Sequence, residues 1–242
     1  MPASQRTDYH RIVFLAGIVT FLIGGAALSG WAFDLPLLTR IDPDWNPMVP
    51  GTALCFVLSG LSLLGSGKSL SARIFVWLTL LLAGARGLEI ASHRQFTGVE
   101  FLATGWGAQF QNIGHMSPQT VMGFLAFGIG MLSIWLADGR KMRMFAGTMA
   151  GLLLAMGVTV TFGYWLKLQY LFETIYIETG LIWMSMQTAV GMTLLGAGLL
   201  CLSIRCEESS VAVVAEQRAK QIYHTTVFLV IVTSVAVDVP PS

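Results

Sequence analysis

Residues 113–133 read IGHMSPQTVMGFLAFGIGMLS and form the central copy of a pattern that occurs three times in the chain. The other copies are WNPMVPGTALCFVLSGLSLL at 45–64 and IWMSMQTAVGMTLLGAGLLCLS at 182–203. The three copies align without gaps at a spacing of 68 residues. Four columns are identical: Met48, Met116 and Met184; Thr52, Thr120 and Thr188; Gly60, Gly128 and Gly196; Leu64, Leu132 and Leu200. We therefore expect an internal repeat.

Each copy has the features of a helix start. Pro50 and Pro118 suit the first turn of a helix, where a missing N–H costs nothing, and Asn46 or Ser117 just upstream can accept bonds from unpaired N–H groups. The shared Thr can satisfy a backbone group where water is absent. The Gly eight residues later lies on the same helix face and permits close helix approach. We interpret the shared residues as structural first of all.

The composition is that of a membrane protein. Of 242 residues, 55% are hydrophobic and only 11% are charged, whereas soluble domains carry about 25% charged residues. The net charge of +1 excludes the basic surface that nucleic-acid binding needs. Three cysteines without framework spacing argue against disulfides and against a zinc site. We predict that the lipid bilayer surrounds the chain and that nucleic acid is not a partner.

Apolar runs of about 20 residues, the length that crosses a bilayer core, recur along the chain. They predict an all-α polytopic bundle of six to seven transmembrane helices. The six main spans are 12–33, 48–64, 74–91, 118–136, 144–166 and 181–204. A seventh candidate, 225–237, is short for a helix that crosses alone, so that six and seven spans both stay open. The spans pair into three pseudo-repeated hairpins, at about 11–66, 73–137 and 143–204.

The distribution of Lys and Arg predicts the orientation. With the N-terminus inside, ten of the 14 basic residues are cytoplasmic and three are outside, as the positive-inside rule requires. The ten are Arg6, Arg11, Lys68, Arg73, Arg140, Lys141, Arg143, Arg205, Arg218 and Lys220; the three are Arg40, Arg94 and Lys167. We predict a multi-pass protein of the bacterial inner membrane with a cytoplasmic N-terminus.

The tryptophans cluster near the predicted membrane boundaries. Five lie near the outer boundary and two near the inner one, and we interpret them as an aromatic belt. They are Trp31, Trp45, Trp106, Trp165 and Trp183 outside, and Trp77 and Trp135 inside. The alternative is an aromatic box for an apolar or cationic ligand.

The segment FGYWLKLQYLFETIYIETGLIWMSMQTAVGMTLLGAGLL at 162–200, with MSPQTVMGFLAFGIGMLS and VPGTALCFVLSGLSLL, resembles a known domain type. It is similar to the repeated N-terminal membrane domain that precedes PAS, histidine kinase or diguanylate cyclase modules in bacterial signalling proteins. The resemblance covers about residues 11–204 and implies a membrane sensor domain in 1–204. The chain ends at Ser242 without a kinase, ATP-binding, cyclase or PAS segment. We therefore consider a kinase or cyclase, or a second copy in a homodimer, as its protein partner.

Residues 205–242 follow the last main span on the predicted cytoplasmic side. The stretch 207–223 begins acidic and carries apolar residues at helical spacing, which is typical of a linker helix or of an amphipathic helix on the membrane surface. The residues beyond it are either the seventh span or the start of a truncated region.

Ionisable residues within the spans indicate a ligand site, since burying a charge in the membrane is costly. Arg86, Glu89 and His93 lie at i, i+3 and i+7 on one helix face, and Arg86 and Glu89 can pair. His115 begins the second repeat motif and reaches the level of His93 if the loop folds back. A neutral structural pair is the alternative to a polar ligand site. Two imidazoles can hold haem, but we predict no metal and no cofactor because no His-x₃-His spacing and no second facing pair occurs.

The sequence contains no nucleophile elbow, phosphate loop or zincin motif, so we predict that it is not an enzyme. We expect a sensory module that binds a small apolar or amphipathic ligand at the outer ends of its hairpins. The positive N-termini of the helices at Thr120 and Thr188 favour an anionic or carbonyl-bearing ligand. The alternatives are a small transporter or channel, and a membrane protein that binds haem or quinone.

Overall fold

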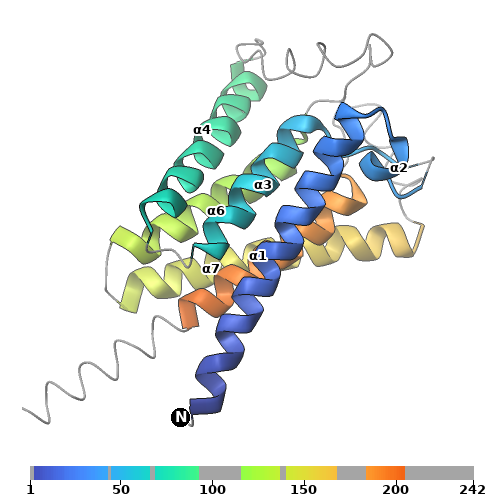
Figure 1. The fold of residues 1–242 in the computed structure, drawn as a ribbon. Coiled ribbons are helices and arrows are strands. Elements are labelled where there is room, and N and C mark those ends of the chain that lie inside the picture. Colours follow the sequence, from blue (N-terminus) through green and yellow to red (C-terminus); the bar gives the residue numbers. More distant parts are fainter. Residues whose placement is uncertain are drawn as a thin grey trace, which may run out of the picture.

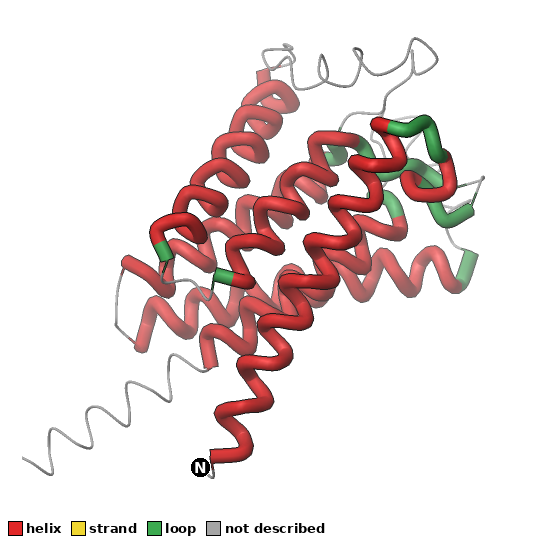
Figure 2. Tube along the Cα trace, in the orientation of Figure 1, coloured by secondary structure: helices red, strands yellow, loops and turns green. Residues whose placement is uncertain are grey.

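The computed structural model describes residues 3–42, 45–65, 69–92, 116–136, 140–167 and 184–204. These residues form seven helices and no strand. The helices are α1 (Ala3–Ala32), α2 (Pro36–Thr39), α3 (Pro50–Leu64), α4 (Leu70–Ser92), α6 (Pro118–Leu136), α7 (Arg140–Trp165) and a last helix, Met186–Ile204, called here the 186–204 helix. The long helices pack side by side as a bundle (Figure 1), and the described residues between them are short turns (Figure 2). The predicted all-α class is confirmed.

Five helices are long and apolar enough to cross a membrane. They are Tyr9–Ala32 within α1, then α4, α6, α7 and the 186–204 helix. The predicted second span is shorter than expected, because α3 begins only at Pro50 and has 15 residues. At 1.5 Å per residue it measures about 22 Å, less than the hydrocarbon core of about 30 Å. The predicted seventh span lies outside the described residues.

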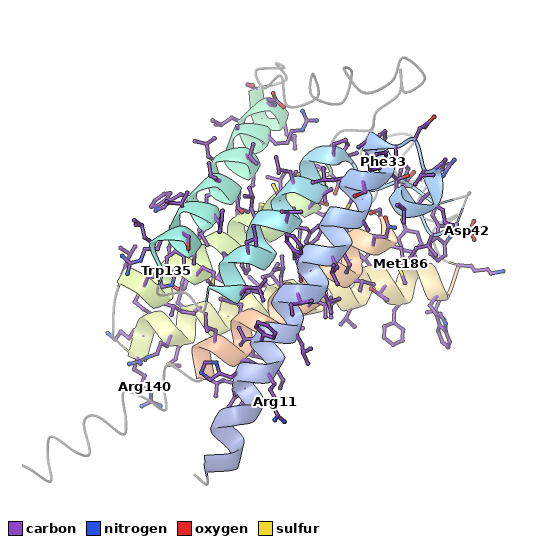
Figure 3. All side chains as sticks on the ribbon, in the orientation of Figure 1. Arg11, Phe33, Asp42, Trp135, Arg140 and Met186 are labelled. Carbon is purple, nitrogen blue, oxygen red and sulfur yellow. The ribbon has the colours of Figure 1, made fainter. Side chains whose placement is uncertain are left out.

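Large apolar side chains cover the outside of the bundle. Leu22 on α1 is 58% exposed and Leu81 on α4 is 66% exposed. A soluble monomer rarely exposes so much contiguous apolar surface, whereas in a bilayer this surface contacts lipid. Basic residues gather at one end, where Figure 3 places Arg11 and Arg140, while Phe33 and Asp42 lie at the other end. The surface therefore supports a multi-pass membrane protein.

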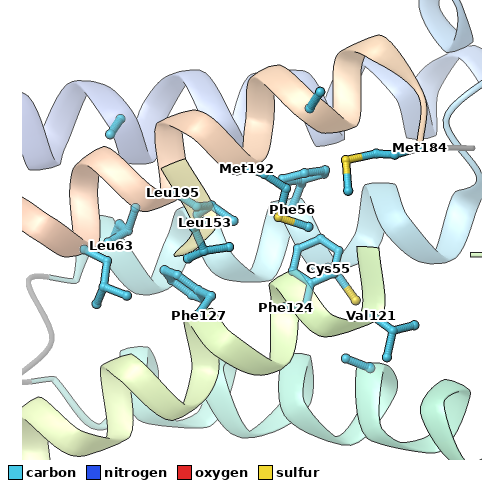
Figure 4. Close-up of a cluster of buried hydrophobic side chains, with 14 of the residues drawn as sticks. Cys55, Phe56, Leu63, Val121, Phe124, Phe127, Leu153, Met184, Met192 and Leu195 are labelled. Carbon is cyan, nitrogen blue, oxygen red and sulfur yellow. The ribbon is translucent and has the colours of Figure 1, made fainter. Parts of the chain in front are cut away.

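The three helices that carry the repeated motif, α3, α6 and the 186–204 helix, are called here the return helices. They enclose the core. Phe56, Phe124 and Met192 lie on these three helices and are fully buried. The rings of Phe56 and Phe124 meet edge to face with their centroids 4.9 Å apart. Figure 4 shows this cluster between the helices. The three residues are spaced by 68, so the aligned motif columns meet at the centre of the bundle.

The long helix that precedes each return helix in the chain is called here an outgoing helix. The outgoing helices are α1, α4 and α7, and they pack around the return helices. α1 contacts α3, α4 contacts both α3 and α6, and α7 contacts α6. The 186–204 helix closes the ring: a Cβ added to Gly198 would lie 2.9 Å from Leu63 and 3.3 Å from Ala16. One added to Gly196 would lie 2.8 Å from the backbone nitrogen of Leu154. Each outgoing helix thus lies between two return helices.

The pair α1 and α3 and the pair α7 and the 186–204 helix approach closely at small residues. A Cβ added to any of four glycines would come within 3.0 Å of a backbone carbonyl oxygen of the partner helix. The contacts are Gly24 with Ala53 and Gly60 with Gly17 in the first pair, and Gly157 with Ala189 and Gly196 with Ala150 in the other. Matching residues are 133 positions apart on the outgoing helices and 136 apart on the return helices.

The same two pairs share a polar contact at the end where the outgoing helix finishes. The indole Nε1 of Trp31 donates to the carbonyl oxygen of Met48 at 2.8 Å. The hydroxyl of Tyr164 donates to the carbonyl oxygen of Met184 at 2.9 Å. Trp31 and Tyr164 are again 133 positions apart, and Met48 and Met184 are 136 apart. Both bonds tie the last turn of an outgoing helix to the chain just before a return helix.

Both outgoing helices of these pairs also end alike. Asp34 and Lys167 follow the ends of α1 and α7 with φ of 55° and 54°. A non-glycine residue rarely adopts this left-handed conformation, which commonly closes a helix at its C-terminus. These two residues are 133 positions apart as well, so the correspondence extends from the contacts to the backbone.

Local interactions set the starts of the return helices. Ser117 Oγ accepts a bond from the backbone N–H of Thr120 at 3.3 Å, and Ser185 does the same for Thr188. The two hydroxyls in each Ser and Thr pair are 2.8 and 2.7 Å apart. The expected cap by Asn46 is wrong, because the N-cap of α3 is Val49, which makes no side-chain bond.

Candidate functional site

The pair α4 and α6 packs differently from the other two pairs. A Cβ added to Gly128 would collide with the side chain of Leu80, whereas Gly60 and Gly196 face backbone atoms. Leu80 stands at the position of Gly17 and Ala150 in the other outgoing helices. Both Gly128 and Gly196 face neighbouring helices, as the sequence predicts, but the close contacts of Gly128 are made by the side chain of Leu80 alone, whereas those of Gly196 include backbone atoms.

The next contact along α4 is also looser. A Cβ on Gly87 would have one neighbour within 4 Å, Cγ1 of Val121 at 3.4 Å. At the matching position Gly24 would meet the Ala53 oxygen at 2.6 Å. Small residues allow close approach of membrane helices, but Leu80 holds α4 away from α6. The second pair is therefore the most loosely packed of the three.

This loosely packed helix carries the predicted ion pair. Arg86 Nη1 donates to Glu89 Oε2 within hydrogen-bond distance. The side chains of Arg86 and Glu89 are 15% and 3% exposed. The return helices α3, α6 and 186–204 contain no charged residue. An isolated charge at the centre of a bilayer would cost about 2.5–3.5 kcal/mol on insertion scales, so the pairing of Arg86 with Glu89 lowers the cost of placing either charge in the bundle.

The ion pair lies near the start of α6. Gly87 follows Arg86 and faces Val121, the fourth residue of α6. The backbone N–H of Thr120 in that first turn donates to Ser117 Oγ, and both of these residues are buried. A helix N-terminus carries a partial positive charge. The site therefore combines a guanidinium, a carboxylate and a helix N-terminus, a set that suits the recognition of an anionic or carbonyl-bearing group.

The other two predicted site residues, His93 and His115, lie outside the described residues, and their proximity stays a prediction. Within the described part of the chain, no group of three or more His, Cys, Asp and Glu side chains could hold a metal ion. Met48, Met116 and Met184, the first column of the motif, are buried.

The aromatic belt prediction is wrong for Trp31. This residue is only 5% exposed, because its N–H bonds the Met48 carbonyl within the bundle. Trp45 is also engaged inside the protein, since its ring lies 5.1 Å from that of Tyr164. Trp165, in contrast, is 78% exposed, as a residue at a membrane boundary would be. The two bonds to methionine carbonyls had no recognisable signal in the sequence.

An apolar groove of about 200 Å³ lies elsewhere, between α7 and the 186–204 helix. Its walls include Val158, Phe162, Val190 and Leu194. Arg86 and Glu89 do not line it, so it is separate from the charged site.

No protein-family model matches the chain, and neither a curated protein nor a solved structure matches it.

Proposed function

We propose that residues 1–204 form a sensory module of the bacterial inner membrane, built from three hairpin repeats with a cytoplasmic N-terminus. Two helix pairs share contacts at constant spacings of 133 and 136 residues, and the motif columns of all three return helices meet in the core. We count the short helix α3 as a span, which brings the number to six, because it packs along α1 from the contact of Gly24 with Ala53 to the contact of Gly17 with Gly60. In this proposal, a conformational change of the bundle is transmitted through the 186–204 helix to residues 205–242.

The buried Arg86 and Glu89 pair carries this proposal. A bundle that needs only rigidity gains little from an ion pair, because apolar residues of similar volume often serve stability as well or better. The pair lies on the most loosely packed outgoing helix, where a change of partners requires the least repacking. We therefore assign Arg86 as the residue that binds an anionic amphiphile and Glu89 as its partner in the empty state.

Binding exchanges one carboxylate for another. Arg binds carboxylates with charge-assisted, often bidentate hydrogen bonds, so a ligand carboxylate replaces Glu89 on Arg86. The displaced Glu89 moves α4, whose contact with Gly128 is made by the flexible side chain of Leu80. α4 also meets α3 at the opposite end, where a Cβ on Gly65 would lie 2.8 Å from Ala72. A shift of α4 thus reaches the end of the bundle where the basic residues gather.

Decanoate is the probe for this site, and decanol is its uncharged counterpart. Purified protein in detergent is heated with each compound, since a ligand that binds the folded state raises the apparent melting temperature. We expect decanoate to raise it in the wild type and in Leu88→Met, a matched lipid-facing variant of α4. In Arg86→Met and in Glu89→Gln, the shift of the apparent melting temperature with decanoate should differ from that of the wild type.

The double variant Arg86→Met with Glu89→Gln separates response from folding. It leaves no unpaired charge, so it should accumulate in the membrane as the wild type does and show no shift with decanoate. If decanoate gives the wild type no larger shift than decanol does, the proposed ligand class is wrong. If the double variant keeps the full shift, or if both single variants fail to accumulate, the pair is structural.

Cysteine labelling tests the orientation. Single cysteines placed in 34–42 should react with an impermeant reagent from outside the cell, and cysteines in 138–142 should not. Labelling of residues 138–142 from outside would reverse the proposed topology.

A further inference from the structure

The three interfaces between a return helix and the next outgoing helix differ in polarity. At the interface of α6 and α7, a Cβ on Gly130 would lie 3.3 Å from Cβ of Met149, and one on Gly123 would lie 2.7 Å from Cε of Met156. Between these two contacts, Phe127 and Leu153 occupy the same faces and are fully buried. The interface is apolar between these two contacts.

The corresponding positions at the interface of α3 and α4 are small or polar. We obtain the residues that face each other between α3 and α4, which are in contact, from the facing residues of α6 and α7. Each α3 position is the α6 position minus 68, and each α4 position is the α7 position minus 70. This register aligns Ser62 with Thr79, Ser59 with Ala83, and Cys55 with Arg86. All of these residues except Arg86 are fully buried. In this register Ser62, Thr79 and Ser59 bring three hydroxyl groups to the interface of α3 and α4, and Arg86 stands at its end.

Ser59 is the residue that this arrangement leaves unsatisfied. Ser62 Oγ donates to the Ser59 carbonyl at 2.7 Å, and Thr79 Oγ1 donates to the Phe75 carbonyl at 2.9 Å. The Ser59 hydroxyl has no hydrogen-bond partner, although the residue is fully buried. Native structures satisfy nearly all buried polar groups, and ordered water does so where no protein group can.

The side chains that this register places beside Ser59 are small. Ser59 and Ala83 stand where the interface of α6 and α7 holds Phe127 and Leu153, so the polar interface lacks most of that apolar volume. The third interface, of the 186–204 helix with α1, places Leu195 opposite Thr20, whose hydroxyl also lacks a partner. That interface therefore has one bulky side chain, Leu195, and it has Ile23 at the position where α4 has Arg86.

We propose that the interface of α3 and α4 is a hydrated seam, in which water bound at Ser59 continues past Cys55 to the Arg86 and Glu89 pair. The eight residues from Thr79 to Arg86 span about 10 Å of helix. Arg86, with its side chain 15% exposed, forms the outer mouth of the seam. Water there solvates the ion pair from within the bundle, so that the pair can open without leaving bare charges in hydrocarbon.

Thiol reactivity tests the seam, because the reaction needs water to form the thiolate. In the full chain with Cys201→Ala and Cys206→Ala, Cys55 should react with 2-aminoethyl methanethiosulfonate while the protein is folded in lipid nanodiscs. In a background without native cysteines, Ala83→Cys should react at least tenfold faster than Leu153→Cys, its counterpart in the apolar interface. Intact-mass spectrometry follows each reaction, and complete labelling in SDS shows that every thiol is competent.

Ser59→Leu provides the second measurement, because it places at this position the side chain that Leu195 has in the equivalent one. It should slow the labelling of Cys55 at least tenfold without lowering the melting temperature. Equal rates for Ala83→Cys and Leu153→Cys, or unchanged Cys55 labelling in Ser59→Leu, would show that the seam is dry. No ligand is present in either assay, so the result stands apart from the response to decanoate.

Discussion

The first and second helix pairs carry the same motif on their return helices but differ on their outgoing helices. In the first pair Gly17 and Gly24 bring two backbones together, whereas in the second Leu80 stands in the place of Gly17 and Gly87 faces only Val121. Backbone contacts have one close-packed arrangement, and a contact through a leucine side chain has several rotamers. The motif therefore sets where each return helix begins, and the outgoing helix decides how firmly the pair is held.

The largest effect is expected where a new side chain would meet backbone. Gly60→Leu and Gly196→Leu place a Cβ 2.7 Å from the Phe21 nitrogen and 2.8 Å from the Leu154 nitrogen. Each should lower the free energy of unfolding by about 3 kcal/mol, the upper end for overpacking. SDS titration in mixed micelles measures this loss. Gly151→Leu is the control, since a Cβ there has no neighbour within 4 Å; an equal loss in the control would disprove close packing as the cause.

Gly128→Leu is expected to cost less, about 2 kcal/mol, and to be reversible by a second substitution. Leu80→Ala removes the side chain that the new Leu would meet, so the double variant should regain most of the loss in a double-mutant cycle. Leu154→Ala should not rescue Gly196→Leu in the same way, because the backbone nitrogen stays in place. Similar rescue in both pairs would mean that the second pair is as close as the third.

The two aromatic residues that bond methionine carbonyls should contribute equally. Trp31→Phe and Tyr164→Phe each remove one donor and leave a buried carbonyl unpaired, at a cost of about 1 kcal/mol or somewhat more. Thermal unfolding in detergent compares them with Trp165→Phe, which alters an exposed side chain and should change nothing. Costs that differ strongly between Trp31 and Tyr164 would show that the two pairs are not equivalent.

The smallest effect concerns the helix cap that α3 lacks. Val49→Ser gives α3 the residue that caps the other return helices, and should raise the free energy of unfolding by roughly 0.5–1 kcal/mol. Ser117→Ala and Ser185→Ala should lose a similar amount, measured in the same titration. A destabilising Val49→Ser would mean that the start of α3 differs in backbone geometry from the other two.

The sequence predicted what depends on local pattern. Apolar runs and Pro50 and Pro118 placed most of the helices, the motif glycines predicted helix contacts, and the spacing of Arg86 and Glu89 predicted their bond. The sequence predicted three repeated hairpins but not the residue-by-residue correspondence of the outgoing helices, because the spacing between an outgoing helix and its return helix differs. Trp31 precedes Met48 by 17 residues and Tyr164 precedes Met184 by 20, so an alignment without gaps cannot match both ends of a hairpin.

Other features depend on tertiary contacts that no local pattern encodes. From the sequence, Trp31 is predicted to be a membrane-boundary residue. In the structure its indole N–H donates to a carbonyl oxygen 17 residues away, inside the bundle. Leu80 looks like any apolar residue of a span, and its role as a spacer appears only opposite Gly128. The apolar run from Met48 predicts a longer second span, but the helix starts after Val49 because Pro50 suits its first position.

The bonds from Trp31 and Tyr164 have a consequence for protein engineering and for divergence. Each bond joins the last turn of one helix directly to the chain just before the next long helix, so the connecting segment closes between anchored points. Closing a loop twice as long costs only about 0.6 kcal/mol more. The segments that connect α1 to α3 and α7 to the 186–204 helix are thus suitable places to insert an epitope or a fluorescent tag. For the same reason, related chains can change in length and sequence there while the packing of the bundle stays unchanged.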